Sequence, residues 1–319
     1  MGSNRGQRNN VLPQRTLKTS IHCSGIGVHT GIKVNMTLHP ADPGAGIVFR
    51  RSDLQNGGSI VEATWARAAE TPMCTTLIGE GGAKVATVEH LMAALSGCGI
   101  DNCLVELNGP EVPAMDGSAA PFVFLIECAG TVEQAAPRRV LEIRKEIEVT
   151  GPDRAVSISP GRGLAVEFEI DFESPAVARQ AWSTHVDEHS FKRDISRART
   201  FGFMEEVDQL RAMGLAQGGS LDNAIVISDG NILNEDGLRY DDEFVRHKVL
   251  DLIGDLYLAG GPIVGRVRGV RAGHALTLRL LKTLFADEDA WRWRDMTEAD
   301  LTMPMGSSVP PARAVAARA

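Results

Sequence analysis

The sequence lacks a surplus of basic residues and long apolar runs, and each absence excludes a class of protein. Its 33 Lys and Arg residues are outnumbered by 41 Asp and Glu residues, which gives a formal net charge of −8. Because contacts to phosphate groups need a surplus of positive side chains, we expect no nucleic-acid partner. No apolar stretch is long enough to span a bilayer, so we expect no transmembrane segment.

Paired cysteines and a targeting segment are also missing. The five cysteines are odd in number, and none belongs to a CxxC pair. This pattern favours reduced thiols in a cytoplasm over a disulfide framework. The polar start, MGSNRGQRNNVLPQR, has no apolar segment behind it, so we do not expect a secretory signal.

The rest of the composition is that of an ordinary globular protein, and 319 residues are enough for two domains. In the first half, short strand-like segments precede a helix that Thr87 is expected to cap and a second helix that starts near Ser118. In the second half, strand-like segments between residues 140 and 172 precede further helices. Strands followed by helices, twice over, predict an α+β fold whose domains each pack helices on one face of a sheet.

The predicted domain boundary is the polar, proline-containing segment 131–139. It separates an N-terminal domain, residues 12–135, from a C-terminal domain, residues 136–300. Residues 1–11 and 303–319 are expected to be disordered tails, because they offer too few apolar groups to pack.

The clearest single element is a helix over residues 244–259, reading FVRHKVLDLIGDLYLA. Its apolar residues recur at helical spacing, while His247, Asp251 and Asp255 lie four residues apart and form one stripe. This stripe is either an ordinary solvated face or part of a metal site held by His247 and Asp251. A catalytic zinc typically takes three protein ligands, so the second interpretation needs one more from elsewhere.

Among the eight histidines, His90 is the best candidate for that third ligand. It follows Glu89 in the first turn of its predicted helix. Neighbouring helical residues point about 100° apart, so His90 could bind a metal while Glu89 serves as a base. A purely structural histidine is the alternative. His274 begins a helix after a glycine, where its side chain can reach into a cleft. The remaining strand-region histidines are expected to be packing or surface groups: His22, His29 and His39.

A rival metal motif lies further along the chain. His185, Glu188 and His189 fit the H-x-x-E-H pattern of inverted zinc peptidases. That chemistry needs both histidines on one helix. Asp187 is expected to be a helix N-cap, which would leave His185 outside the helix. The motif is therefore the weaker of the two metal hypotheses.

Several stretches together resemble one enzyme family. They are TVEHLMAAL (87–95), GIDN (99–102), MDGSAAPF (115–122), ISRARTFGFM (195–204), LNEDGLRYDDEFVRHKVLDLIGD (233–255) and GHAL (273–276). In this order, from about Gln14 to Trp293, the chain resembles the UDP-3-O-acyl-N-acetylglucosamine deacetylases, the zinc enzymes of lipid A synthesis in Gram-negative bacteria. The resemblance implies a hydrolase that removes the N-acetyl group and releases acetate, the committed step of that synthesis.

The resemblance also implies the roles of individual residues. One zinc ion per chain would be bound by three residues: His90, His247 and Asp251. Glu89 would be the general base, and His274, with Asp255 as its carboxylate partner, would assist the developing charge or the leaving amine. Thr200 matches the hydroxyl beside the scissile acetamide. A non-catalytic metal-binding module is the alternative, although a structural zinc site usually has four protein ligands and no base.

The family fold implied for the chain is two similar two-layer α/β sandwiches that face each other across the active site, each with a small insert. The insert of the second domain, about residues 202–222, would form a passage for the acyl chain. The residues implied in substrate binding are Lys248, Phe201, Thr277, Met73, Cys74, Phe203, Val207, Gly219 and Leu221. Thr277 stands where the family often has Asn, and the segment around Ala216 and Leu221 often carries bulkier or sulfur-bearing residues, so the acyl preference is left open.

The implied partner is a small molecule, acylated UDP-N-acetylglucosamine. We expect a monomer in the cytoplasm of a Gram-negative bacterium, with transient contact to a membrane surface.

Overall fold

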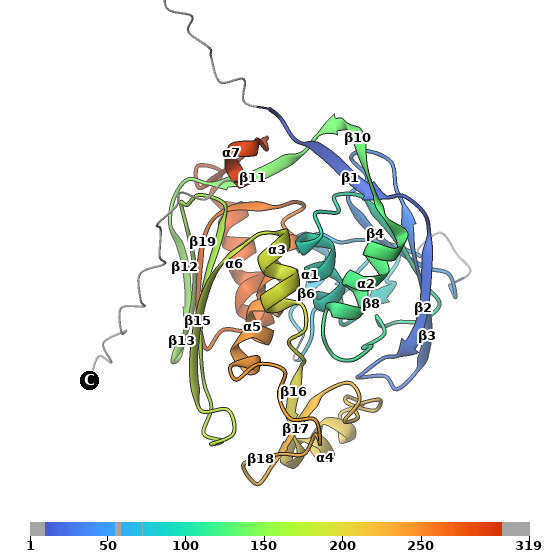
Figure 1. The fold of residues 1–319 in the computed structure, drawn as a ribbon, viewed down its shortest axis with the longest axis vertical. Helices are drawn as coiled ribbons and strands as arrows, with labels where there is room; N and C mark the ends of the chain where they lie inside the picture. Colours follow the sequence, from blue (N-terminus) through green and yellow to red (C-terminus); the bar gives the residue numbers. More distant parts are fainter. Residues whose placement is uncertain (1–9, 55–58, 72, 302–319) are drawn as a thin grey trace, which may run out of the picture.

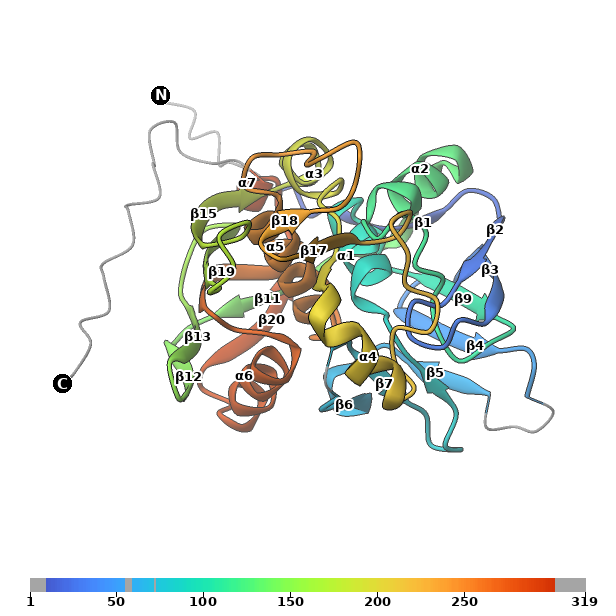
Figure 2. The same cartoon turned by 90° about the horizontal axis from the view of Figure 1, so that it is seen from below.

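The structure, a computed structural model, describes residues 10–54, 59–71 and 73–301. Its fold is α+β, as predicted. Two large β-sheets form opposite sides of the molecule, and the longer helices lie between them (Figure 1). At the centre, α1 (Glu89–Gly97) packs against α5 (Glu243–Tyr257), as both views show (Figures 1 and 2).

The first large sheet comes from the N-terminal part of the chain. Its strand order is β2 (Ile21–Ile26), β3 (Lys33–Pro40), β9 (Cys103–Leu107), β4 (Ile47–Arg51) and β5 (Ile60–Glu62). In β3, Val34, Met36 and Leu38 are buried and the intervening residues are not, which is the alternation typical of a half-buried strand. Helix α2 (Ala120–Ala129) contacts β2 and α1, so it lies on the helical side of this sheet.

The second large sheet comes from the C-terminal part of the chain. Its main path is β12 (Ile147–Gly151), β13 (Arg154–Ser159), β19 (Ile263–Val270), β11 (Arg139–Ile143) and β20 (Trp291–Asp295). The two further strands are β14 (Leu164–Asp171), which pairs with β19, and β15 (Arg179–Val186), which pairs with β14. Helix α5 contacts β14 and β15, and α6 (His274–Ala286) contacts β12 and β13.

Smaller elements fill the space around the helices. One three-stranded sheet consists of β6 (Ala68–Ala69), β7 (Thr76–Ile78) and β8 (Lys84–Val85). Another consists of β16 (Phe201–Phe203), β17 (Ile225–Ser228) and β18 (Asn231–Ile232), with α4 (Met204–Ala212) beside it. The short helices are a 3-10 turn (Trp65–Arg67), α3 (Glu188–Ser190), a π-helical turn (Phe191–Ile195) and α7 (Glu298–Leu301).

Segment 131–139, predicted as a polar boundary, is not an open linker. Most of it is strand β10 (Thr131–Pro137), which pairs antiparallel with β1 (Pro13–Leu17). The division into domains 12–135 and 136–300 stays a prediction. The disorder predicted for residues 1–11 is wrong at the last two of them. Asn10 O accepts a hydrogen bond from Glu298 N at 3.2 Å, and Val11 forms a β-bridge with Thr297. Residues 1–9 and the predicted tail 303–319 lie outside the described residues.

Thr87 is not the cap of α1, contrary to prediction. The residue before the helix is Val88, and no side chain caps it. Thr87 has a φ of 56°, and its hydroxyl donates to Oε1 of the buried Glu111 at 2.9 Å. A tertiary hydrogen bond has therefore replaced the local one that its sequence position favours.

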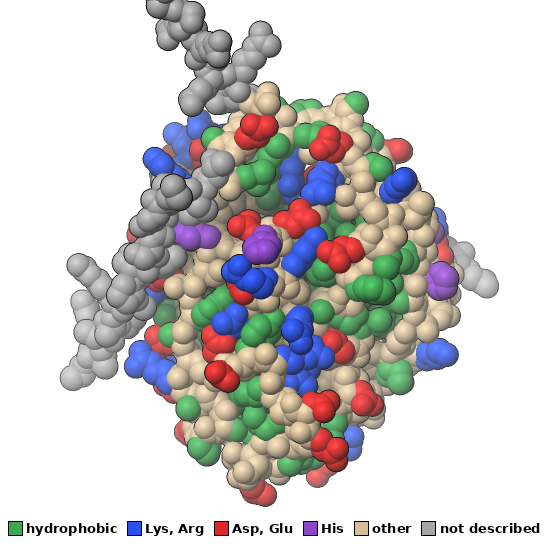
Figure 3. Space-filling view, in the orientation of Figure 1, with side chains coloured by type: hydrophobic (Ala, Val, Ile, Leu, Met, Phe, Trp, Pro, Cys, Tyr) green, Lys and Arg blue, Asp and Glu red, His purple; other side chains and the backbone are tan. Residues whose placement is uncertain are grey.

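The distribution of charge on the surface agrees with a sequence that has no surplus of basic residues. On the face shown in Figure 3, acidic and basic side chains are interspersed, and no broad basic patch is visible there. Among the described residues, no helix combines the length and apolar character needed to cross a membrane.

Gly254 sets the close approach of α5 to α1. A Cβ at this position would lie 2.0 Å from the carbonyl oxygen of Glu89 and 3.1 Å from the nitrogen of Ala93. Only a residue without a side chain fits there, so α5 rests directly on the backbone of α1. This contact brings residues of the two helices, far apart in the sequence, into one site.

We expect Gly254→Ala to destabilise the protein and disturb that site. The added methyl group meets rigid backbone, and overpacking of this kind costs about 1–3 kcal/mol or more. Thermal unfolding and metal content measure the two effects. Gly202→Ala is the matched control, because a Cβ there meets no atom within 4 Å. Equal thermal midpoints for the two variants would contradict the role of Gly254.

Candidate metal centre

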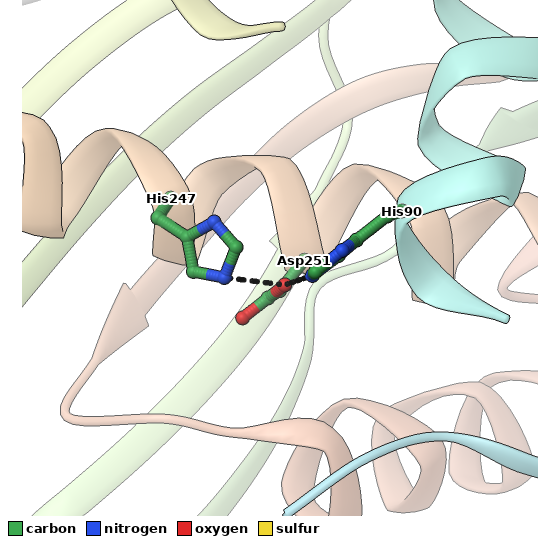
Figure 4. Close-up of side chains that lie close together, drawn as sticks. All are labelled: His90, His247 and Asp251. Carbon is green, nitrogen blue, oxygen red and sulfur yellow. Dashed lines mark ion pairs between the residues drawn. The ribbon is translucent and has the colours of Figure 1, made fainter. Parts of the chain in front are cut away.

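Helices α1 and α5 bring three metal-ligand side chains together. His90 comes from α1, and His247 and Asp251 come from α5 (Figure 4). One ligand atom from each lies within 4.8 Å of the other two, and all three side chains are buried. Asp251 Oδ1 is 3.3 Å from His247 Nε2 and 3.5 Å from His90 Nε2. The two imidazoles therefore converge on one carboxylate oxygen.

The chemistry of this cluster fits a divalent cation. Asp251 Oδ1 is buried and has no hydrogen-bond partner among the described residues, a state that is costly unless a cation satisfies it. His247 Nδ1 lies 3.0 Å from the carbonyl oxygen of Ala198. Because that carbonyl can only accept, Nδ1 carries the proton and Nε2 is free to bind a metal.

The protonation states support the same conclusion. Burial lowers the pKa of His247 to about 3, so its imidazole is neutral, the form that binds metals. Burial favours the neutral form of Asp251, but the charged and hydrogen-bonding groups around it, the Lys248 ammonium among them, outweigh it and hold the pKa of Asp251 well below its ordinary value. Lys248 Nζ donates to Asp251 Oδ2 at 3.0 Å. Two imidazoles and one carboxylate form a donor set typical of catalytic zinc sites.

Glu89 lies next to this cluster as a buried carboxylate. Its Oε2 accepts a hydrogen bond from the backbone nitrogen of Thr75 at 3.0 Å, while Oε1 is 3.9 Å from His274 Nε2. Burial raises the pKa of Glu89 above its ordinary value. A carboxylate with a raised pKa accepts a proton more readily at neutral pH, which suits a general base.

His274 and Asp255 form a hydrogen-bonded pair beside Glu89 and the metal-ligand cluster. His274 Nδ1 lies 2.7 Å from Asp255 Oδ2, and Nε2 is 3.9 Å from Asp251 Oδ2. Burial alone would lower the pKa of His274, but the charge and hydrogen bond of Asp255 outweigh it and raise this pKa to about 10. A cation on the neighbouring ligands would lower this value again by repulsion. The pair can therefore hold a proton beside the metal ligands.

A cavity of about 830 Å³ connects these groups to the surface. Most of the predicted site residues line it: Glu89, His90, His247, Asp251, His274, Thr200, Lys248, Phe201, Phe203, Met73, Val207, Gly219 and Leu221. Three others do not. Asp255 and Cys74 are buried, and buried Thr277 has its hydroxyl 3.4 Å from the carbonyl oxygen of Gly273. Direct substrate contact by Cys74 or Thr277 therefore has no support from the shape of the cavity.

Known proteins are similar to this sequence over most of its length. The family model described as "LpxC: UDP-3-O-acyl N-acetylglycosamine deacetylase" matches residues 14–286. The UDP-3-O-acyl-N-acetylglucosamine deacetylase of Acidithiobacillus ferrooxidans is 53% identical over 290 residues, 90% of this chain and 95% of the relative. That of Marinobacter nauticus is 52% identical over 88% of this chain and 92% of its own length. This chain belongs to the UDP-3-O-acyl-N-acetylglucosamine deacetylase family.

Membership in the deacetylase family confirms the resemblance seen in the sequence and removes the peptidase hypothesis. The structure gives the physical reason. Asp187 caps α3 with a reciprocal capping box, as expected, so His185 lies on β15 and His189 lies within α3. His189 Nε2 lies 3.1 Å from an Arg193 nitrogen. Within residues 10–54, 59–71 and 73–301, the cluster of His90, His247 and Asp251 is the only one with ligand atoms in range of a metal.

Sequence reasoning missed several residues around the deacetylase cavity. His29, expected to be a packing or surface group, lines the cavity. The buried Glu111 holds the turn that carries it by accepting hydrogen bonds from His29 N at 2.9 Å and Thr30 N at 2.8 Å. Further missed lining residues are Phe172, Arg154, Arg271 and Arg279. Exposed arginines on hairpins and helices carry no periodic signal, so only the fold could reveal them.

Proposed function

We propose that this deacetylase uses one zinc ion per chain to remove the N-acetyl group of UDP-3-O-acyl-N-acetylglucosamine, a step of lipid A biosynthesis. One observation supports the proposal above all. Three candidate metal ligands, a buried carboxylate and a histidine–aspartate pair lie together beside one cavity. His90, His247 and Asp251 would hold the zinc. Three protein ligands with an adjacent base favour a catalytic site over a structural one.

When bound, zinc supplies two effects, since it acidifies a water molecule and polarises the amide carbonyl. Glu89 takes the proton of the attacking water as the new C–O bond forms. His274 donates a proton from Nε2 to the leaving nitrogen as the C–N bond breaks, which releases acetate and a free amine. Asp255 keeps His274 oriented through the bond to Nδ1. Thr200 lies on the cavity wall and would bind the acetamide.

The rest of the cavity offers two different surfaces for the substrate. Arg154 and Arg271 lie on its wall and can bind the anionic diphosphate. Met204, Val207 and Leu210 of α4 also line it. Helix α4 contains no buried residue, so it is not an ordinary core helix, and its apolar side chains are available to an acyl chain. This supports the proposal that residues 202–222 form the acyl passage.

We expect a charged residue in that passage to weaken binding of the acyl chain selectively. Each buried methylene contributes about 0.8 kcal/mol, so the loss of two raises KM about tenfold. Leu221→Asp or Val207→Asp should therefore raise KM for the acylated substrate by that factor or more. KM for the substrate without its acyl chain should change little.

Met213→Asp is the matched control for the passage variants. Met213 directly follows α4 and is 66% exposed, but it does not line the cavity. It should leave both KM values unchanged. An equal rise of KM for acylated and deacylated substrates in the passage variants would show that residues 202–222 do not form the passage.

Metal analysis paired with an acetate-release assay tests the function as a whole. We expect about one zinc per chain, and chelation should abolish acetate release until zinc is restored. A protein that holds zinc yet releases no acetate from the acylated sugar nucleotide would instead be the non-catalytic metal-binding module.

We also propose that the enzyme acts as a monomer in the bacterial cytoplasm and touches a membrane surface transiently. All five cysteines are free, which suits a reducing compartment. Met73, Met204 and Leu221 line the cavity and are at the same time among the exposed large hydrophobic residues. Apolar groups at a cavity mouth can contact lipid while an acylated molecule enters or leaves.

A further inference from the structure

Thr75 is a buried residue that contacts one proposed catalytic residue on each of three helices. It directly precedes β7 and is 5% exposed. Its backbone nitrogen donates to Glu89 Oε2 at 3.0 Å, and its carbonyl oxygen accepts from Val88 N at 3.3 Å. Its hydroxyl donates to Asp255 Oδ1 on α5 at 2.6 Å and lies 3.2 Å from His274 Nδ1 on α6. One residue therefore joins the proposed base to the proposed acid pair.

The hydrogen-bond directions around Thr75 determine that Nδ1 of His274 carries a proton. A hydroxyl has one proton, and Thr75 gives it to Asp255 Oδ1. Facing His274, the same oxygen can only accept, as can Asp255 Oδ2. His274 Nδ1 must therefore carry a proton. Its Nε2 then points toward the metal ligands and Glu89, 3.9 Å from Asp251 Oδ2 and Glu89 Oε1.

We propose that Thr75 is a positioning residue of the deacetylation reaction, which orients Asp255 and His274 through its hydroxyl and Glu89 through its backbone. The inference rests on the proposed function, since it assigns a role within that mechanism. Without the hydroxyl, Asp255 Oδ1 loses its short bond and the carboxylate can rotate away from His274. Nε2 would then no longer be held toward the leaving nitrogen.

Packing alone does not explain a hydroxyl at this position. Valine has the same shape and would fill the space equally well, but it would leave Asp255 Oδ1 without this donor. Water could not readily take its place. The void beside Thr75, Asp255 and His274 measures about 10 Å³, at the lower limit for a single water molecule. Alanine would enlarge this void, so valine is the sharper substitution.

The test compares Thr75→Val, Thr75→Ser and wild type for kcat, KM, zinc content and thermal unfolding. Loss of a supporting hydrogen bond of this kind typically costs about 10–100-fold, and we expect that loss in kcat. KM and zinc content should stay close to wild type, and the thermal midpoint should fall by only a few degrees because one buried acceptor loses its donor. Thr75→Ser, which keeps the hydroxyl, should recover most of kcat. If the valine variant does not fold, Thr75→Ala tests the same bond with a smaller expected loss.

Two controls isolate the bond to Asp255. Thr76→Val makes the same change one residue later, where the hydroxyl contacts Thr71 and Cys74, and should leave kcat unchanged. In an Asp255→Ala background, Thr75→Val should cause a much smaller loss than in the wild type, because only the contact of its hydroxyl with His274 Nδ1 is left to lose.

A wild-type kcat in Thr75→Val, or the same fold loss with and without Asp255, would overturn the proposal. Acetate release by the wild-type enzyme in the same assay tests the proposed function separately. A failure there is distinguishable from a failure of the Thr75 variants to behave as expected.

Discussion

Glu89→Gln is expected to keep its zinc and to lose turnover by roughly 10²–10⁴-fold. The change preserves the shape of the side chain, and its amide oxygen can still accept from Thr75 N, but the basic oxygen is lost. The loss corresponds to about 2.7–5.5 kcal/mol of transition-state stabilisation. Metal analysis and kcat, measured on the same preparation, check the two halves of this expectation.

The other possible roles of Glu89 predict different results. If Glu89 were a metal ligand, zinc would be lost together with activity. If it were only a favourable charge in the first turn of α1, the change would cost roughly 0.3–1 kcal/mol of stability and leave turnover nearly intact. A Glu89→Gln enzyme with bound zinc and wild-type turnover would refute the general-base mechanism.

The pH dependence of kcat/KM also tests Glu89 as the base, together with His274 as the acid. Glu89 must be deprotonated and His274 protonated, so the profile should be bell-shaped. Because the pKa of Glu89 is raised by burial, the acidic limb should lie above the ordinary Glu value. Because the pKa of His274 is raised by Asp255, the basic limb should lie above the ordinary His value. Glu89→Gln should flatten the acidic limb and His274→Ala the basic one.

His247→Ala and Asp251→Ala are each expected to abolish stoichiometric zinc binding and, with it, activity. Each change removes one of three ligands, and Asp251→Ala also removes the charge that balances the cation. Zinc content after dialysis is the direct measurement. Thermal unfolding, with and without added zinc, shows whether metal binding stabilises the folded state, as it should for the wild type.

The double variant His185→Ala/His189→Ala is the matched control for these ligand changes. It removes two imidazoles from the H-x-x-E-H segment, which lies outside the metal cluster. It should retain its zinc. Loss of zinc in this variant and retention in His247→Ala would show that the metal site has been placed wrongly.

Some features of the site could be predicted from the sequence because they depend on local geometry. His247 and Asp251 are one helical turn apart, so any helix through them puts both on one face. The capping role of Asp187 is equally local, because the reciprocal bonds to Ser190 span three residues. The alternation of buried and more exposed residues in β3 depends only on the two-residue period of a strand. Local periodicity, together with the family resemblance, predicted the α+β fold and the three side chains that the structure brings together as a candidate metal site.

Other features depended on contacts between distant segments. Nothing in the spacing of His90 places it against α5. Gly254 brings His90 close to α5, because a residue without a side chain lets α5 lie on the backbone of Glu89. Thr87 lost its predicted capping role because Glu111 offered a buried acceptor. Strand β10 was missed because its order comes from backbone pairing with β1, while its side chains are mostly exposed or half-buried.

The sequence by itself therefore determined which helix faces carry the proposed catalytic groups, because i,i+4 spacing is a property of one helix. The tertiary structure decided how those faces meet. Thr75 contacts Glu89, Asp255 and His274, which are 14, 180 and 199 residues away in the chain. Hydrogen bonds across such separations leave no periodic signal in a single sequence, since their geometry exists only after the helices and sheets have packed.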